Sequence, residues 1–258
     1  MEKGLYVAVS GSMAQERAMD VIANNLANVN TPGFKSDNLL FEAYLQESTD
    51  PKADLPTTRE IDQGYLSKRM HDSTYMIASQ SYVDFSQGNL KPTGNMYDIS
   101  LSGDGFFSVM TPEGERLTRG GTLSVSAEGE LTTTGGNPFL DITGKKITVG
   151  RDNFTVDEGG SVFSKTDNRF LGKLRVIDFP DKAVLAKRGK NLFESLAPEQ
   201  AVESKTAVRQ GYIEGSNVNP MAEITRMITA VRTYEAYQKS IQTHDEMDSR
   251  LINNVGRA

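Results

Sequence analysis

The sequence predicts an α+β protein, with a long helix near each end of the chain and a central, mainly antiparallel β domain. Apolar residues recur at every third or fourth position in residues 1–35 and 219–258, which is the spacing of one helix face. In residues 80–218 apolar and polar residues alternate, as they do in half-buried strands. Residues 36–79 carry weak signals, and we expect an extended segment there that connects the first helix to the β domain.

The first helix should run for about 25 residues, a length of ~37 Å. Pro32 disfavours helical backbone at Thr31, and Gly33 can adopt a positive φ, so the helix should end at this turn. Four asparagines lie between positions 24 and 30, where their amides compete for the hydrogen bonds of the helix backbone. We therefore expect these amides to suit hydrogen bonds to neighbouring chains.

The second helix has a clear start, because Asn219 is a good N-cap, Pro220 suits the first helical position and Glu223 suits the first turn. It should run for about 35 residues, ~50 Å. A helix of that length is stable mainly when its apolar stripe is covered. Two interpretations remain: the terminal helices assemble with other copies, or they form an ordinary hairpin within one core. The repeated asparagines favour assembly.

Short alternating stretches mark the strands of the central region, among them Ile99–Ser102, Phe107–Val109 and Leu123–Val125. Glycines separate these stretches at hairpin distances, and Glu113-Gly114 and Glu128-Gly129 are typical of tight turns. Many short strands joined by such turns favour antiparallel pairing.

The composition limits the partners of the chain. Its net charge is −6, whereas nucleic-acid binding needs a surplus of Lys and Arg. Both terminal regions are neutral, so the acidic surplus lies between them. The first residues lack the basic start and long apolar run of a secretory signal, and no early apolar run approaches the ~20 residues of a membrane helix. We expect no nucleic acid, no membrane insertion, and either a cytosolic protein or export that cleaves no signal peptide.

Few residues offer catalytic or metal-binding chemistry. The chain has no Cys and two histidines, His71 and His244, far apart in sequence. His244 and Asp248 would share a helix face, but no third metal ligand accompanies them. Gly103-Asp104-Gly105 departs from the dinucleotide-binding pattern and indicates a turn between strands. We therefore expect a non-enzyme with no catalytic residue, no cofactor and no metal site.

Several motifs resemble those of the bacterial flagellar axial proteins, which include rod, hook and hook-associated proteins. The longest is the N-terminal signature, Ala23-Asn24-Asn25-Leu26-Ala27-Asn28-Val29-Asn30-Thr31-Pro32-Gly33-Phe34-Lys35. Other motifs of the family are resembled by Phe85–Leu90, Gly94–Ile99, Gly103–Phe107, Leu117–Gly121, Gly215–Pro220 and Thr233–Gln238. The resemblance spans the whole chain.

The resemblance implies a structural function. In that family the terminal helices pair as an inner coiled-coil layer around an export channel, and the β domain lies outside it. Subunits stack helically into the rod, the periplasmic drive shaft that transmits torque from motor to hook. The implied partners are other copies, the other proximal and distal rod proteins and the flagellar type III export apparatus.

The length fits the rod proteins, and the ending Asn253–Ala258 resembles the proximal rod protein. The distal rod protein remains an alternative, as does a non-flagellar globular binding module.

The residues expected at the assembly interface are the apolar helix positions and the polar and turn residues of the two terminal motifs. They are Leu5, Val9, Met13, Ile22, Asn24, Asn25, Leu26, Asn28, Thr31, Pro32, Gly33, Phe34, Asn217, Asn219, Pro220, Ile224, Ile228, Val231, Tyr234, Ile241 and Leu251.

Overall fold

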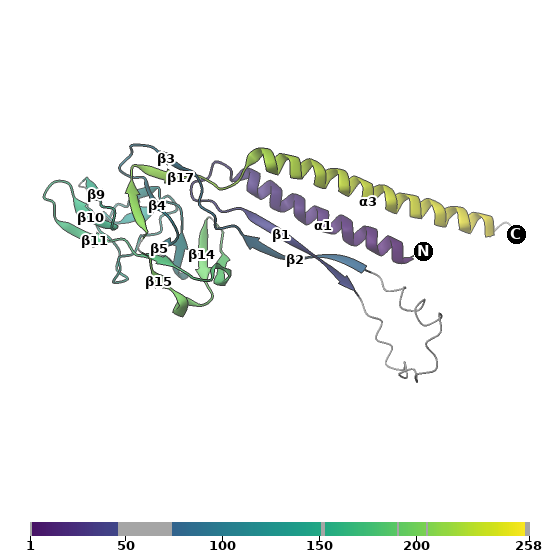
Figure 1. Ribbon diagram of the computed structural model, residues 1–258, viewed down its shortest axis with the longest axis horizontal. Helices are drawn as coiled ribbons and strands as arrows, with labels where there is room; N and C mark the ends of the chain where they lie inside the picture. The colour runs from purple at the N-terminus through teal and green to yellow at the C-terminus, as the bar shows by residue number, and fades with distance from the viewer. Residues whose placement is uncertain (1, 46–73, 151–152, 190, 205, 256–258) are drawn as a thin grey trace, which may run out of the picture. The chain divides into compact units, whose positions relative to one another are not determined.

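The structure is a computed structural model that describes residues 2–45, 74–150, 153–189, 191–204 and 206–255 (Figure 1). The chain divides into two compact units. The first, which we call the helix unit, comprises Met1–Asn24, Asn38–Tyr82 and Met221–Ala258. The second, which we call the β unit, comprises Asn25–Asp37 and Val83–Pro220. His71 and the segment 47–59 of the predicted connection lie outside the described residues.

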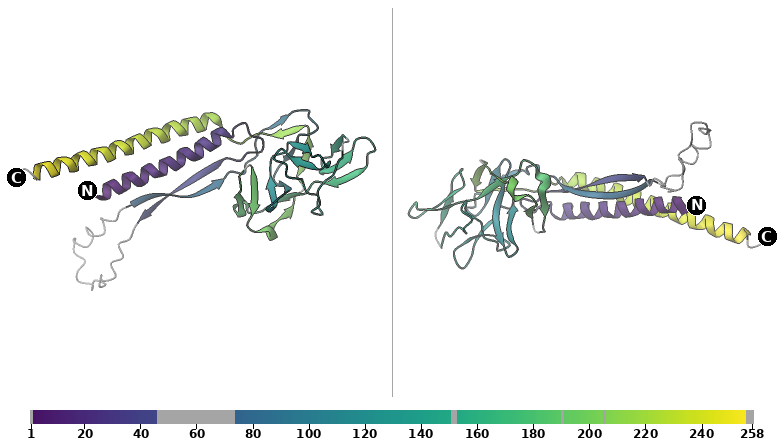
Figure 2. Two further views of the ribbon diagram at one scale, coloured as in Figure 1. Left: turned by 180° about the vertical axis from the view of Figure 1, so that it is seen from behind. Right: turned by 90° about the horizontal axis from the view of Figure 1, so that it is seen from below.

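The helix unit contains two helices and a two-stranded sheet: α1 (Glu2–Ala27), α3 (Pro220–Val255), β1 (Asp37–Leu45) and β2 (Thr74–Val83). In Figures 1 and 2, α1 lies between α3 and the β1–β2 pair. Small residues allow this close approach: Ala8, Ser12 and Ala14 of α1 are buried. A Cβ atom built on Gly11 would lie 2.5 Å from Cζ of Tyr237, so the Tyr237 ring packs where only glycine leaves room.

The prediction of long terminal helices that pair as a coiled-coil layer is wrong, although the chain is α+β overall. The helices differ in length, 26 against 36 residues. Five of the apolar residues expected in the seam are 37–58% exposed instead: Val9, Met13, Ile224, Ile228 and Val231. Ile22, which was also expected there, is buried. The spacing of large apolar residues selected mainly exposed positions, because the buried face of α1 carries small residues that contribute little to an apolar pattern.

The β unit is built from short strands, and its described strand pairs are antiparallel. A six-stranded sheet has the order β13-β14-β6-β5-β12-β15, and a three-stranded sheet has the order β11-β10-β9. The remaining strands pair as β16-β4, β17-β3 and β7-β8. The predicted alternating stretches 99–102, 107–109 and 123–125 lie in β4, β5 and β7.

The bounds of these elements are β3 (Leu90–Pro92), β4 (Ile99–Ser102), β5 (Phe106–Thr111), β6 (Gly114–Thr118), β7 (Leu123–Val125), β8 (Leu131–Thr133), β9 (Phe154–Val156), β10 (Ser161–Ser164), β11 (Phe170–Lys173), β12 (Val176–Asp178), β13 (Leu185–Lys187), β14 (Leu192–Ser195), β15 (Val202–Glu203), β16 (Ala207–Gln210) and β17 (Tyr212–Glu214). Two short 3-10 helices, η1 (Lys182–Val184) and η2 (Pro198–Gln200), lie between the later strands.

The six-stranded sheet carries apolar side chains on both faces. Because successive side chains of a strand point to opposite faces, β5 sends Phe107 and Val109 into one apolar cluster and Phe106 into the other. Phe193 joins Phe106 in the smaller cluster, with ring centroids 5.7 Å apart. The β unit thus covers the residues of these two clusters with its own strands, whereas Phe170, Leu196 and Val202 stay exposed. None of the described helices is long and apolar enough to cross a membrane.

Candidate functional site

The N-terminal signature ends in a loop that belongs to the β unit. We call Asn25–Asp37 the entry segment, because here the chain passes from α1 into the β unit. Asn25 closes this segment: its Nδ2 donates to the carbonyl oxygen of Asp37 at 2.8 Å, and the Asp37 N–H donates to its Oδ1 at 3.0 Å. Asn25 is buried, so its amide finds its partners within the chain.

Gly33 is the tightest point of the entry segment. Its φ is +69°, the left-handed conformation that the sequence predicts for it. A Cβ atom at this position would lie 2.5 Å from the carbonyl carbon of Arg119. Its N–H donates to the backbone carbonyl oxygen of Glu214 at 2.8 Å. Backbone conformation and space therefore both require glycine here.

Beside this turn, Lys35 forms a buried ion pair with Glu214. The Nζ–Oε1 distance is 2.6 Å, and the two side chains are 0% and 1% exposed. Lys35 Nζ also donates to the carbonyl oxygen of Ser86 at 2.7 Å, and the N–H of Gly88 donates to Oε1 at 3.1 Å. Burial lowers the pKa of Lys35 from its ordinary 10.5, although Glu214 opposes this shift.

Arg119 brings a second cation to the same carboxylate. Its Nη1 lies 3.3 Å from Oε2 of Glu214, and its Nη2 donates to the carbonyl oxygen of Gly103 at 2.7 Å. Its guanidinium carbon lies 5.5 Å from the centroid of the Phe106 ring. Burial lowers the pKa of Arg119, with Glu214 again opposing the shift. We call Lys35, Arg119 and Glu214 the ion cluster.

A second lysine covers the entry segment from the β13–β14 hairpin. Lys187 Nζ lies 4.1 Å from the centroid of the buried Phe34 ring and 2.8 Å from Oδ2 of Asp37. It also donates to the carbonyl oxygen of Lys35 at 3.1 Å. In the turn of the same hairpin, Asn191 donates through Nδ2 to the carbonyl oxygen of Pro32 at 3.1 Å.

The chain leaves the β unit beside the place where it enters. Asn217 Oδ1 accepts the N–H of Ser36 at 2.8 Å, and its Nδ2 donates to the carbonyl oxygen of Asp84 at 2.8 Å. The C-terminal motif therefore binds the N-terminal motif directly. This arrangement holds the segment where the chain enters the β unit beside the segment where it leaves.

The predicted interface residues fall into two groups. One group lies in or beside the entry segment: Asn25, Leu26, Asn28, Thr31, Pro32, Gly33, Phe34 and Asn217. The other lies along the helices of the helix unit: Leu5, Val9, Met13, Ile22, Asn24, Ile224, Ile228, Val231, Tyr234, Ile241 and Leu251. Asn219 and Pro220 stand at the start of α3, and the Leu251 side chain is outside the described residues.

The ion cluster and Lys187 were absent from the predicted interface. Lys35 and Arg119 lie inside motifs that the sequence had singled out, so a charged residue among apolar and glycine neighbours was an available signal. Glu214 and Lys187 gave no such signal, because their partners are distant in sequence.

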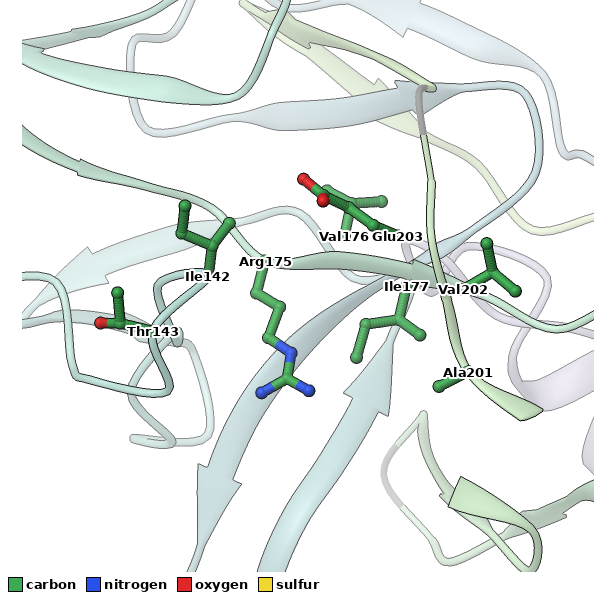
Figure 3. Close-up of a pocket in the computed structure, with 8 residues that line it drawn as sticks. All are labelled: Ile142, Thr143, Arg175, Val176, Ile177, Ala201, Val202 and Glu203. Atoms are coloured by element: carbon green, nitrogen blue, oxygen red, sulfur yellow. The ribbon is translucent and has the colours of Figure 1, made fainter. Parts of the chain in front are cut away.

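A pocket of about 280 Å³ lies elsewhere on the β unit (Figure 3). Most of its lining is aliphatic, from Ile142, Val176, Ile177, Ala201 and Val202, with Thr143, Arg175 and Glu203 as its polar residues. Within the described ranges, no three or more His, Asp or Glu side chains gather in a way that could hold a metal ion.

Comparisons with known proteins agree with the resemblance. Family matches cover residues 5–35 (Flagella basal body rod protein), 100–164 (Flagellar hook protein FlgE/F/G D1 domain) and 209–254 (Flagellar basal body rod FlgEFG protein C-terminal). The flagellar basal-body rod protein FlgG of Borreliella burgdorferi is 33% identical over 269 residues, covering 100% of both chains. FlgG of Agrobacterium fabrum is 33% identical over 98% of this chain and 99% of its own. FlgF of Caulobacter vibrioides is 30% identical over 100% of this chain and 99% of its own. These relatives are rod proteins of the flagellum rather than enzymes, and the chain belongs to the flagellar basal-body rod protein family.

Proposed function

We propose that this chain is a structural subunit of the flagellar rod whose terminal regions, residues 1–35 and 219–258, make the contacts between subunits. The observation that carries this proposal is the exposed apolar stripe of α3, formed by Met221, Ile224, Ile228 and Val231. Exposed apolar side chains gathered along one helix face are typical of a protein–protein contact. On α1, Tyr6, Val9 and Met13 are exposed as well.

Burial of the exposed apolar side chains of α3 would favour contacts with other subunits. Covering one large aliphatic side chain contributes about 1.5–3 kcal/mol. The four side chains of the α3 stripe together offer enough apolar area to contribute substantially to association. The neutral charge balance of both terminal regions permits dense packing of many copies, while the middle of the chain, residues 36–218, which carries the acidic surplus, would stay solvated.

The substitution Ile228→Glu tests this role of α3. Ile228 is 49% exposed, so the monomer should keep its circular dichroism and melting temperature while polymerisation and motility are lost. Ala236→Glu is the matched control, because it places the same charge on an exposed position of α3 outside the stripe. A strain that swims normally with Ile228→Glu would contradict the proposed contact.

The finer proposal is a place in the proximal rod, which the ending Asn253–Ala258 supports. The alternative is the distal rod, and the 33% identity to two FlgG proteins favours it. An epitope inserted at the exposed turn Lys165–Asn168 of the β unit would decide, because antibody labelling of isolated basal bodies reads position along the rod. Labels beside the hook would overturn the proximal assignment.

We further propose that the flagellar export apparatus delivers the chain to the periplasmic part of the basal body, where the rod transmits torque. Membership of the rod family supports this, and the absence of Cys removes any need for a disulfide in that compartment. A strain without the export apparatus should retain the chain in the cytoplasm. Its recovery from the periplasm of that strain would contradict this route.

A further inference from the structure

Glu214 connects segments of the β unit that are far apart in sequence. Its carboxylate contacts Lys35 at 2.6 Å, the N–H of Gly88 at 3.1 Å and Arg119 at 3.3 Å. Its backbone carbonyl oxygen accepts the N–H of Gly33. Through its side chain and backbone together, Glu214 contacts the entry segment, Gly88 just before β3 and Arg119 just after β6.

The charges of the ion cluster do not balance. Two buried cations share the carboxylate of Glu214, and each cation has a pKa lowered by burial. The desolvation of buried ions commonly exceeds the attraction between them, so such clusters are weak contributors to stability and can instead specify one arrangement. Apolar side chains could fill the same space, but they would not provide the carboxylate that Lys35 needs as its ion-pair partner.

The two ion pairs of the cluster differ in hydrogen bonding. Lys35 makes a short hydrogen-bonded pair with Oε1 and a further bond to Ser86. Arg119 is near Oε2 without a hydrogen bond between them: Nη1 and Nε of Arg119 and Oε2 of Glu214 have no hydrogen-bond partner among the described residues. The ion pair of Lys35 is therefore the one that holds the entry segment.

The cluster also joins the two ends of the chain. Lys35 and Glu214 are 179 positions apart, and Glu214 is the last residue of β17, which pairs with β3. The contact of the entry segment with Glu214 can form only after this last strand has joined the β unit.

We propose that Glu214 and Lys35 are positioning residues, which fix where the entry segment leaves the β unit and so prepare the protein for assembly. The pair holds the entry segment against the rest of the β unit, and this contact forms when β17 pairs with β3. Folding of the β unit itself depends on its apolar clusters and not on Lys35.

The substitution Lys35→Met separates positioning from folding. It leaves Glu214 with Arg119, one anion with one cation, so the β unit should still fold. Glu214→Gln instead leaves two buried cations without that anion, and the equilibrium constant for unfolding should rise roughly 100-fold or more. Lys173→Met is the matched control, since Lys173 forms an exposed ion pair with Glu203, and neither residue is among the charges that act on Lys35 or Arg119.

The readout is a distance distribution from pairs of spin labels, which a chain without native Cys allows. One pair, Asn30→Cys with Lys145→Cys, reports the entry segment against the body of the β unit. A reference pair, Ala127→Cys with Glu199→Cys, lies wholly on that body, and all four positions are exposed. Polymerisation of each variant is measured in parallel.

In Lys35→Met we expect unchanged melting of the β unit, an unchanged reference distance, a broadened Asn30–Lys145 distance and polymerisation reduced at least tenfold. Lys173→Met should match the parent protein in all four. A distance as narrow as that of the parent would overturn the proposal, and so would loss of cooperative melting in Lys35→Met, because Lys35 would then be a folding element. The polymerisation arm rests on the proposed assembly role, whereas the distances do not, so the two failures are distinguishable.

Discussion

The two units of this protein differ in how far they bury their large apolar and charged side chains. The β unit excludes it from two apolar clusters and even from a cluster of three charged side chains. The helix unit leaves large apolar residues exposed on both helices and on its strands, where Leu40 and Phe41 are uncovered. Leu40 and Phe41 are consecutive, so both faces of β1 are open at this point.

This difference indicates where each unit obtains its stability. Interior contacts are sufficient for the β unit. The helix unit, with 36 residues in α3 and an exposed apolar stripe along it, would gain stability from the subunit contacts that we propose. The same contrast explains why apolar spacing selected exposed positions of the helices and missed the small residues that pack within one chain.

A large loss of stability is expected from replacing the glycine at the entry to the β unit. Gly33 and Gly94 share a φ of +69°, but a Cβ would meet Arg119 at Gly33 and open space at Gly94. Gly94→Ala should cost about 1–2 kcal/mol from backbone conformation alone. Gly33→Ala should cost at least ~3 kcal/mol, because conformational strain and overpacking add. Equal costs in chemical denaturation would show that the contact with Arg119 relaxes freely.

Truncation of apolar side chains should separate the two units. Phe107→Ala, in the larger apolar cluster, should lower the free energy of unfolding of the β unit by about 3–5 kcal/mol. Met13→Ala, at a position 58% exposed, should change monomer stability by less than about 0.5 kcal/mol and weaken polymerisation. Denaturation of each monomer and sedimentation of its polymers measure both effects. A large loss of monomer stability in Met13→Ala would remove the contrast between the units.

A smaller effect is expected at Lys187. The substitution Lys187→Met removes its interaction with the Phe34 ring and its ion pair with Asp37, a partly exposed pair. The loss should be about 1 kcal/mol, since each interaction contributes modestly where water has access. Arg188→Met is a suitable control, because Arg188 lies next in the chain and pairs with the exposed side of Glu194. A neutral result for Lys187→Met would mean that the other contacts of the entry segment suffice to hold it.

The smallest expected effect is the alkaline pH dependence of Lys35, which faces Glu214, Arg119 and Asp84. Burial lowers the pKa of Lys35, so between that lowered value and 10.5 the unfolded chain binds more protons than the folded chain. The free energy of unfolding should therefore rise with pH in this window, and this contribution is lost as pH falls through the lowered pKa. Lys35→Met should lack the rise in parallel titrations, and an identical slope in both proteins would assign it to another group.

The sequence predicted the elements better than their contacts. Strands at 99–102 and 123–125, the N-terminal turn and the start of α3 follow from local rules, because spacing, glycine and proline act within a few residues. The packing of α1 does not, since Ala8 and Gly11 matter for their small size and not for apolar character. The ion cluster depends on partners 179 positions apart, and no local pattern links Lys35 to Glu214.

Amide hydrogen exchange on the dilute monomer tests most directly whether the two units differ in their source of stability. In the dilute monomer we expect strong protection in β5, β6 and β14 of the six-stranded sheet and weak protection along α1 and α3. Protection of the helices should appear on polymerisation. Protection of Ala8–Ile22 and Ile224–Ile241 in the dilute monomer equal to that of β5 would contradict it. The helix unit would then be stable by itself, and assembly would add contacts to helices that are already ordered.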